Sequence, residues 1–167
     1  MCLLLAGLAA CAGSPIKEYN HALLLMDNGL VTEAEQSFLQ TIKKNPKYAE
    51  AWNQLGIIAF DRKDLDRAES LFKKAMELDR LHPAYPRNLA YVYAEQKKYE
   101  LARPLFQRSL SLDPTESITY IGLAKIEILL ENKTAAREAL RAALDIDPAN
   151  PEAKELLARL GEDPHNQ

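Results

Sequence analysis

The apolar and polar positions of this chain repeat with a period of 34 residues, four times in succession. Small apolar residues mark the register of the four units: Ala34, Ala68, Ala102 and Ala136. A large apolar residue follows four positions later in each unit: Phe38, Phe72, Phe106 and Leu140. Within a unit, apolar residues recur at spacings of three and four, which predicts amphipathic helices. A fixed period of this length indicates one helix pair stacked several times.

The second unit shows the pattern most completely. Its first apolar stripe has helical spacing and consists of Trp52, Leu55, Gly56 and Ala59. A polar turn at residues 62–64 interrupts the stripe, and a second stripe follows: Ala68, Leu71, Phe72, Ala75 and Leu78. Proline closes the other three units at Pro46, Pro114 and Pro148, whereas Arg80 takes that place here.

These residues resemble the tetratricopeptide repeat family, most clearly at Trp52, Leu55, Gly56, Ala68, Phe72 and Ala75. The resemblance implies an all-α fold, an α-solenoid of four helix hairpins in a right-handed superhelix with a C-terminal capping helix. The expected repeats span 15–48, 49–82, 83–116 and 117–150, the capping helix 151–161, and a disordered tail 162–167.

The first twelve residues are uncharged and apolar, unlike the rest of the chain. The run is shorter than the roughly 20 residues that span a bilayer, but it fits the core of a secretory signal. Leu8-Ala9-Ala10-Cys11 resembles the lipobox of bacterial lipoproteins, although no Lys or Arg precedes the run. The resemblance implies a signal peptide over 1–10, an acylated Cys11 (palmitate among its acyl chains) and a short linker over 11–14. By the same resemblance, Ala12 rather than Asp implies sorting to the outer membrane. The alternative is an apolar extension of a cytosolic protein.

Composition and motifs exclude several classes of function for this chain. The net charge is −3, acids and bases are interleaved, and no basic block predicts nucleic-acid binding. The only two cysteines, Cys2 and Cys11, precede the repeats, so the repeats offer neither a disulfide nor a thiol cluster for a metal. The sequence shows no phosphate-binding loop, zinc-protease motif or nucleophile elbow. We therefore expect no enzymatic activity, no cofactor, no metal and no small-molecule substrate.

A second face on the first helix of each repeat is the candidate binding surface. In the family, these first helices line a concave groove. Here they carry more apolar side chains opposite the core stripe than a surface helix needs. In the fourth repeat this face includes Leu129. The predicted groove residues are Tyr19, Leu23, Asn53, Ile57, Phe60, Arg87, Asn88, Tyr91, Ile121, Lys125 and Ile128. The alternative is that neighbouring helices bury most of them.

The chemistry of this face favours an apolar protein segment as ligand, either extended or helical. Some members of the family clamp a C-terminal carboxylate with Lys, Arg and Asn. The matching positions here are Tyr19, Leu23, Gln54, Ala84 and Asn88, of which only Asn88 fits. A carboxylate clamp is therefore not expected.

The leading hypothesis is a non-catalytic scaffold, anchored by lipid to the periplasmic side of the outer membrane, that captures a protein and assists assembly of an envelope complex. Three alternatives share the repeat fold. One is a type IV pilus or secretin biogenesis lipoprotein, and another is an accessory subunit that recruits a cell-wall enzyme. The third is a cytosolic adaptor whose N-terminus is not a signal.

Overall fold

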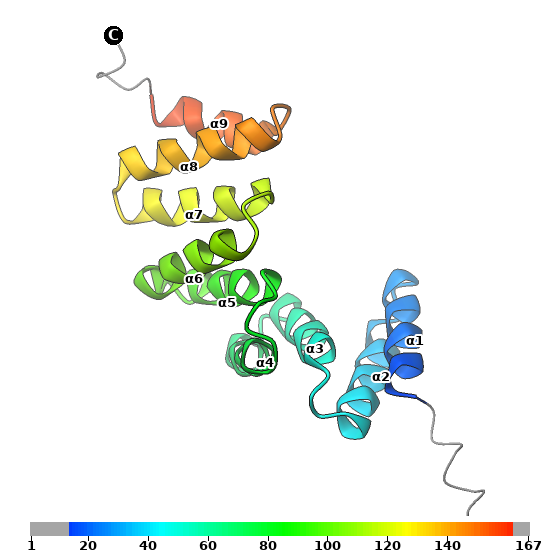
Figure 1. Ribbon diagram of the computed structural model, residues 1–167. Helices are drawn as coiled ribbons and strands as arrows, with labels where there is room; N and C mark the ends of the chain where they lie inside the picture. The colour runs from blue at the N-terminus through cyan, green and yellow to red at the C-terminus, as the bar shows by residue number, and fades with distance from the viewer. Residues whose placement is uncertain (1–13, 162–167) are drawn as a thin grey trace, which may run out of the picture. The chain divides into compact units, whose positions relative to one another are not determined.

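The structure is a computed structural model that describes residues 14–161. These residues form nine α-helices and no strand (Figure 1). The chain divides into two compact units, Met1–Leu78 and Asp79–Gln167. Unit 1 contains α1 (Pro15–Asp27), α2 (Val31–Lys44), α3 (Ala49–Asp61) and α4 (Leu65–Leu78). Unit 2 contains α5 (Ala84–Glu95), α6 (Tyr99–Leu112), α7 (Ser117–Leu129), α8 (Lys133–Ile146) and α9 (Pro151–Arg159).

The core of unit 1 forms where the aligned small and large residues meet. Ala34 and Phe38 of α2 are fully buried, and they form one cluster with Ala22 of α1 and Leu55 of α3. In the second hairpin, Gly56 lets α3 approach the ring of Phe72 closely. A Cβ atom at Gly56 would lie 2.6 Å from Cε1 of that ring, closer than van der Waals contact permits.

Unit 2 repeats this packing, and its last helix covers the apolar face of the helix before it. Within it, α7 packs against both α6 and α8, and α8 packs against α9. Leu156, Leu157 and Leu160 lie on or beside α9 and cover the cluster that contains Leu140 and Ala143 of α8. A terminal helix of this kind removes an apolar face that the last repeat would otherwise expose to water.

The turn inside each hairpin uses the same backbone conformation at positions 34 residues apart. Gly29, Lys63, Lys97 and Glu131 all have positive φ, between 60° and 74°. The residue after each one donates its N–H to a carbonyl five positions back, as Leu30 does to Leu25 at 2.9 Å. This is the Schellman geometry that ends a helix, and glycine adopts it without strain. Only the first hairpin has glycine there.

The turn between hairpins is also periodic. Asn45, Asp79, Asp113 and Asp147 each accept a hydrogen bond from the backbone N–H two residues later, at 2.9–3.2 Å. The closing proline is therefore not needed to form this turn. This explains why Arg80 can take its place in the second repeat: the Asp79 carboxylate fixes the turn instead.

The predicted all-α repeat fold with a C-terminal helix is confirmed, whereas the right-handed superhelix and the exact repeat boundaries stay predictions. The signal peptide over 1–10, Cys11 and the tail over 162–167 lie outside the described residues. Within the part that the structure does describe, none of the helices is long and apolar enough to cross a membrane.

Candidate functional site

The outward side of α5 and α7 in unit 2 carries a group of side chains that we call the unit 2 surface. It consists of Arg87, Tyr91, Ile118, Lys125 and Leu129. The first two come from α5 and the last three from α7. Residues 125 and 129 come seven and eleven positions after residue 118, so all three lie along one stripe of α7. They are also the exposed residues of α7.

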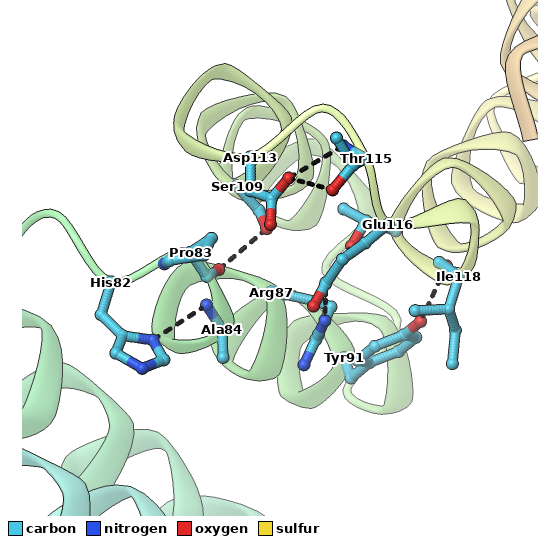
Figure 2. Close-up of polar contacts among 11 residues, drawn as sticks. His82, Pro83, Ala84, Arg87, Tyr91, Ser109, Asp113, Thr115, Glu116 and Ile118 are labelled. Atoms are coloured by element: carbon cyan, nitrogen blue, oxygen red, sulfur yellow. Dashed lines mark hydrogen bonds and ion pairs between the residues drawn. The ribbon is translucent and has the colours of Figure 1, made fainter. Parts of the chain in front are cut away.

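Tyr91 joins this surface to the core beneath it. Its ring packs edge to face on Phe106, with centroids 5.0 Å apart. Its hydroxyl donates to the carbonyl oxygen of Ile118 at 3.3 Å (Figure 2). Gly122 makes room for both rings, since a Cβ there would lie 2.6 Å from Cε1 of Phe106 and 3.0 Å from the Tyr91 hydroxyl. Burial raises the pKa of Tyr91 above its ordinary 10.0.

Both cations of the unit 2 surface are neutralised within the unit. Arg87 forms an ion pair with Glu116, at the start of α7 (Figure 2). Nζ of Lys125 lies 2.5 Å from Oε1 of Glu152 on α9. Glu116 also accepts a hydrogen bond from the hydroxyl of Thr119 at 3.2 Å. The surface therefore presents paired charges around apolar side chains, rather than a free positive charge.

Two large apolar side chains of α7 face solvent. Ile118 is 56% exposed and Leu129 is 53% exposed. Leu129 lies on the face that the sequence singled out, but Ile118 was missed. Ile118 lies seven positions before Lys125 and eleven before Leu129, and this helical spacing could have placed it on the same face.

In unit 1, the corresponding residues of α1 and α3 are half-buried: Tyr19, Leu23, Ile57 and Phe60. Tyr19 packs between Phe38 and Tyr48, with ring centroids 5.5 Å and 5.0 Å away. Leu23 also packs against the core cluster of this unit. We call these four residues the unit 1 surface. Much of its apolar area already contributes to the fold.

Two predicted groove residues do not reach the surface. Asn53 is 8% exposed and Ile121 is 3% exposed. The expectation that they line a solvent-facing groove was wrong, because α3 and α7 each pack against helices on both sides and keep only a narrow open face. Ile121 belongs to the core cluster with Ala124 and Leu140. Asn88 of α5 and Ile128 of α7 are half-buried.

Exposed apolar side chains beside paired charges make the unit 2 surface suited to binding. Across residues 14–161, no group of three or more His, Cys, Asp and Glu side chains is placed to hold a metal ion. The unit 2 surface can bury apolar area from a ligand and exclude water from Ile118 and Leu129, while its paired charges form a polar rim.

Comparisons with known proteins agree with the repeat architecture. Two sequence profiles, both described as tetratricopeptide repeat, match residues 19–86 and 93–160. Superkiller protein 3 of Schizosaccharomyces pombe is 31% identical over 80 residues, which is 46% of this chain and only 6% of that protein.

Two solved structures show the same fold. One is the APC/C hetero-tetramer Cut9–Hcn1, with a TM-score of 0.82 and 22% identity over 92% of this chain and 31% of that one. The other is YrrB, described as a TPR protein with an unusual peptide-binding site, with a TM-score of 0.76 and 18% identity over 88% of this chain and 76% of that one. The two profile matches cover most of the length of the chain. The chain belongs to the tetratricopeptide repeat family.

Proposed function

We propose that the chain is a lipid-anchored scaffold of the bacterial cell envelope that captures a partner protein on the unit 2 surface. The observation that carries the proposal is the pair of exposed apolar side chains on α7, Ile118 and Leu129, among charges that are already paired. Exposed apolar side chains with a polar rim are typical of protein-binding sites. The described peptide-binding site of YrrB, which has the same fold, supports a peptide segment as ligand.

The ligand that fits this surface is an apolar segment without a net negative charge. A carboxylate would have to displace Glu116 from Arg87 or Glu152 from Lys125, and each exchange costs one ion pair for each new one. An apolar side chain meets no such competition. Burying a Leu or Ile side chain contributes about 1.5–3 kcal/mol, which helps to offset the entropy lost on association.

The proposed mechanism is stoichiometric and involves no reaction. The scaffold binds its partner, holds it at the membrane and so raises its local concentration for assembly. A prediction specific to this mechanism is weak dependence on salt, because screening affects free charges more than apolar contacts.

The anchor in this proposal is Cys11, and its support is the Leu8-Ala9-Ala10-Cys11 segment. Two or more acyl chains hold a protein stably on a bilayer, whereas one holds it only marginally. Ala12 supports a place on the periplasmic side of the outer membrane. Assisting assembly of an envelope complex is then the role that combines the anchor with the binding surface.

The anchor is tested by the intact mass of protein purified from membranes of the native host. The proposal predicts a chain that begins at Cys11 and carries acyl groups. A chain that retains Met1 and has no added mass would contradict it, and would favour the cytosolic adaptor.

The binding surface is tested by capture of envelope proteins with Ile118→Ser/Leu129→Ser and with Leu101→Ser/Ile146→Ser. The control pair is also exposed and apolar, but lies on the second helices α6 and α8. We expect the first double variant to lose the captured protein and the control to keep it. Equal capture by both would contradict the proposed surface.

A further inference from the structure

The two ends of the first hairpin carry charge of opposite sign. At one end, the start of α1 meets the end of α2, as the 2.6 Å ion pair between Lys44 and Glu18 shows. The lysines of this hairpin all lie at this end: Lys17, Lys43, Lys44 and Lys47. The acids that accompany them are Glu18 and, at the start of α3, Glu50, so this end has a net positive charge in a chain whose net charge is −3. The other end carries Asp27 and Glu33, both exposed.

The positive end also exposes a large apolar side chain. Ile16, in the first turn of α1, is 56% exposed. Leu24 is equally exposed, at 59%, but lies two turns further along the helix, toward the acidic end. At 1.5 Å per residue, the two positions are about 12 Å apart along the axis. An apolar side chain among lysines has the composition of a surface that binds lipid headgroups.

The length of chain before α1 restricts what this end can meet. Four peptide units connect Cys11 to Pro15, where α1 begins. Even fully extended, they reach only about 14 Å. If Cys11 is acylated, the bilayer surface therefore lies within reach of Ile16 and the nearby lysines.

We propose that the positive end of the first hairpin rests on an anionic phospholipid surface, with Ile16 in the interface and Lys17, Lys43 and Lys47 against headgroup phosphates. This inference rests on the lipid anchor proposed above. The anchor holds the chain at the membrane, and the hairpin end sets its orientation, with Asp27 and Glu33 directed away from the anionic surface. Lysine attraction to such a surface acts within a Debye length of about 8–10 Å, and the tether's reach of about 14 Å allows the lysines to approach that closely.

The test places an environment-sensitive NBD fluorophore on a single introduced cysteine. Ile16→Cys and Leu24→Cys are matched, since both positions lie on α1 and are equally exposed. The acylated protein is purified from membranes and reconstituted into vesicles of phosphatidylglycerol and phosphatidylethanolamine, with or without lipids that carry a nitroxide quencher near the headgroup. We expect NBD at position 16 to lose most of its fluorescence to the quencher and NBD at position 24 to keep most of it.

The charge contribution is tested in the same assay. Lys43→Gln/Lys47→Gln should abolish the difference between positions 16 and 24, and so should replacement of phosphatidylglycerol by phosphatidylcholine. The control Lys133→Gln/Lys154→Gln removes the same charge from two exposed lysines of unit 2 and should leave the difference unchanged.

Three results would overturn the inference. Equal quenching at positions 16 and 24 shows that contact is not confined to this end of the hairpin, and no quenching at either position excludes contact by this end. A blue-shifted NBD spectrum at position 16 without quenching shows that a second copy of the chain covers it. An unacylated Cys11 would be seen in the intact mass and as a second labelled cysteine. That result would overturn the proposed anchor as well, so failure of the anchor can be distinguished from failure of the hairpin contact alone.

Discussion

The ring of Tyr91 meets that of Phe106 edge to face, with centroids 5.0 Å apart, so one side chain belongs both to the core of unit 2 and to its candidate binding surface. Its hydroxyl extends the connection to the backbone of α7 at Ile118. Substitutions at Tyr91 will therefore change stability as well as binding. Ile118 and Leu129 are better sites for testing binding alone, because both are exposed.

Tyr91→Ala is expected to lower the free energy of unfolding by about 2 kcal/mol, since it removes a half-buried ring from its contact with Phe106. Tyr91→Phe keeps the ring and loses one hydrogen bond, which is expected to cost about 0.5–1 kcal/mol. Urea denaturation followed by circular dichroism measures both changes. Full stability of the alanine variant would show that the ring contributes nothing to the fold.

Gly122→Ala is expected to destabilise unit 2 by about 1–3 kcal/mol, because the new Cβ would overlap the ring of Phe106 and crowd the hydroxyl of Tyr91. In an unobstructed helix the same change stabilises by about 0.5–1 kcal/mol, so the sign of the effect is diagnostic.

Phe106→Leu provides the control for this contact. If the clash is with the Phe106 ring, Gly122→Ala should cost less in the Phe106→Leu background than in the native chain. Additive costs in the double variant would place the strain elsewhere.

Lys97→Gly is expected to stabilise unit 2 by about 1 kcal/mol, because Lys97 holds a φ of 60° that glycine adopts without steric cost. The converse change at the equivalent position of the first hairpin, Gly29→Ala, should destabilise by a similar amount. Urea denaturation measures the free energy of unfolding of both variants. Opposite signs support the argument, and two destabilised variants would contradict it.

Glu35 connects the second helix to the following hairpin through ion pairs with Arg62 and, at 2.6 Å, Arg67. Burial alone would raise the pKa of Glu35, but the two guanidinium groups hold that pKa below its ordinary value of 4.5. A carboxylate whose pKa is lower in the folded than in the unfolded state stabilises the fold at pH values above the unfolded pKa. This contribution is lost as the pH falls from about 4.5 through the lower folded pKa.

Glu35→Gln is therefore expected to lower the free energy of unfolding by about 1 kcal/mol at pH 7, a modest value because both arginines are partly exposed. The difference from the native chain should shrink below pH 4.5 and vanish once Glu35 is protonated. Trp52 is the chain's only tryptophan and lies in α3, so its fluorescence reports unfolding of unit 1. The more exposed Glu77→Gln is the control, and an equal loss there would contradict the argument.

The register of the fold was predictable because it depends on local spacing. Ala34, Ala68, Ala102 and Ala136 recur every 34 residues, and all four are fully buried. The non-glycine turn residues were not predictable, since Lys63 and Lys97 adopt positive φ under tertiary constraint, against their own preference.

The candidate surface was only partly predictable. Helical periodicity found Tyr91 and Leu129, but it cannot tell how much of a face neighbouring helices cover, and so it placed the buried Ile121 in the groove. It also could not find the pairing of Lys125 with Glu152, because the two residues lie on different helices.

Photo-crosslinking in the native host tests partner capture on the unit 2 surface. A benzophenone amino acid replaces Ile118, and the comparison probe replaces the exposed Lys133 at the start of α8. We expect an adduct with one envelope protein from position 118, lost in the Leu129→Ser background and absent from position 133. No adduct from position 118, or the same adducts from both positions, would contradict it.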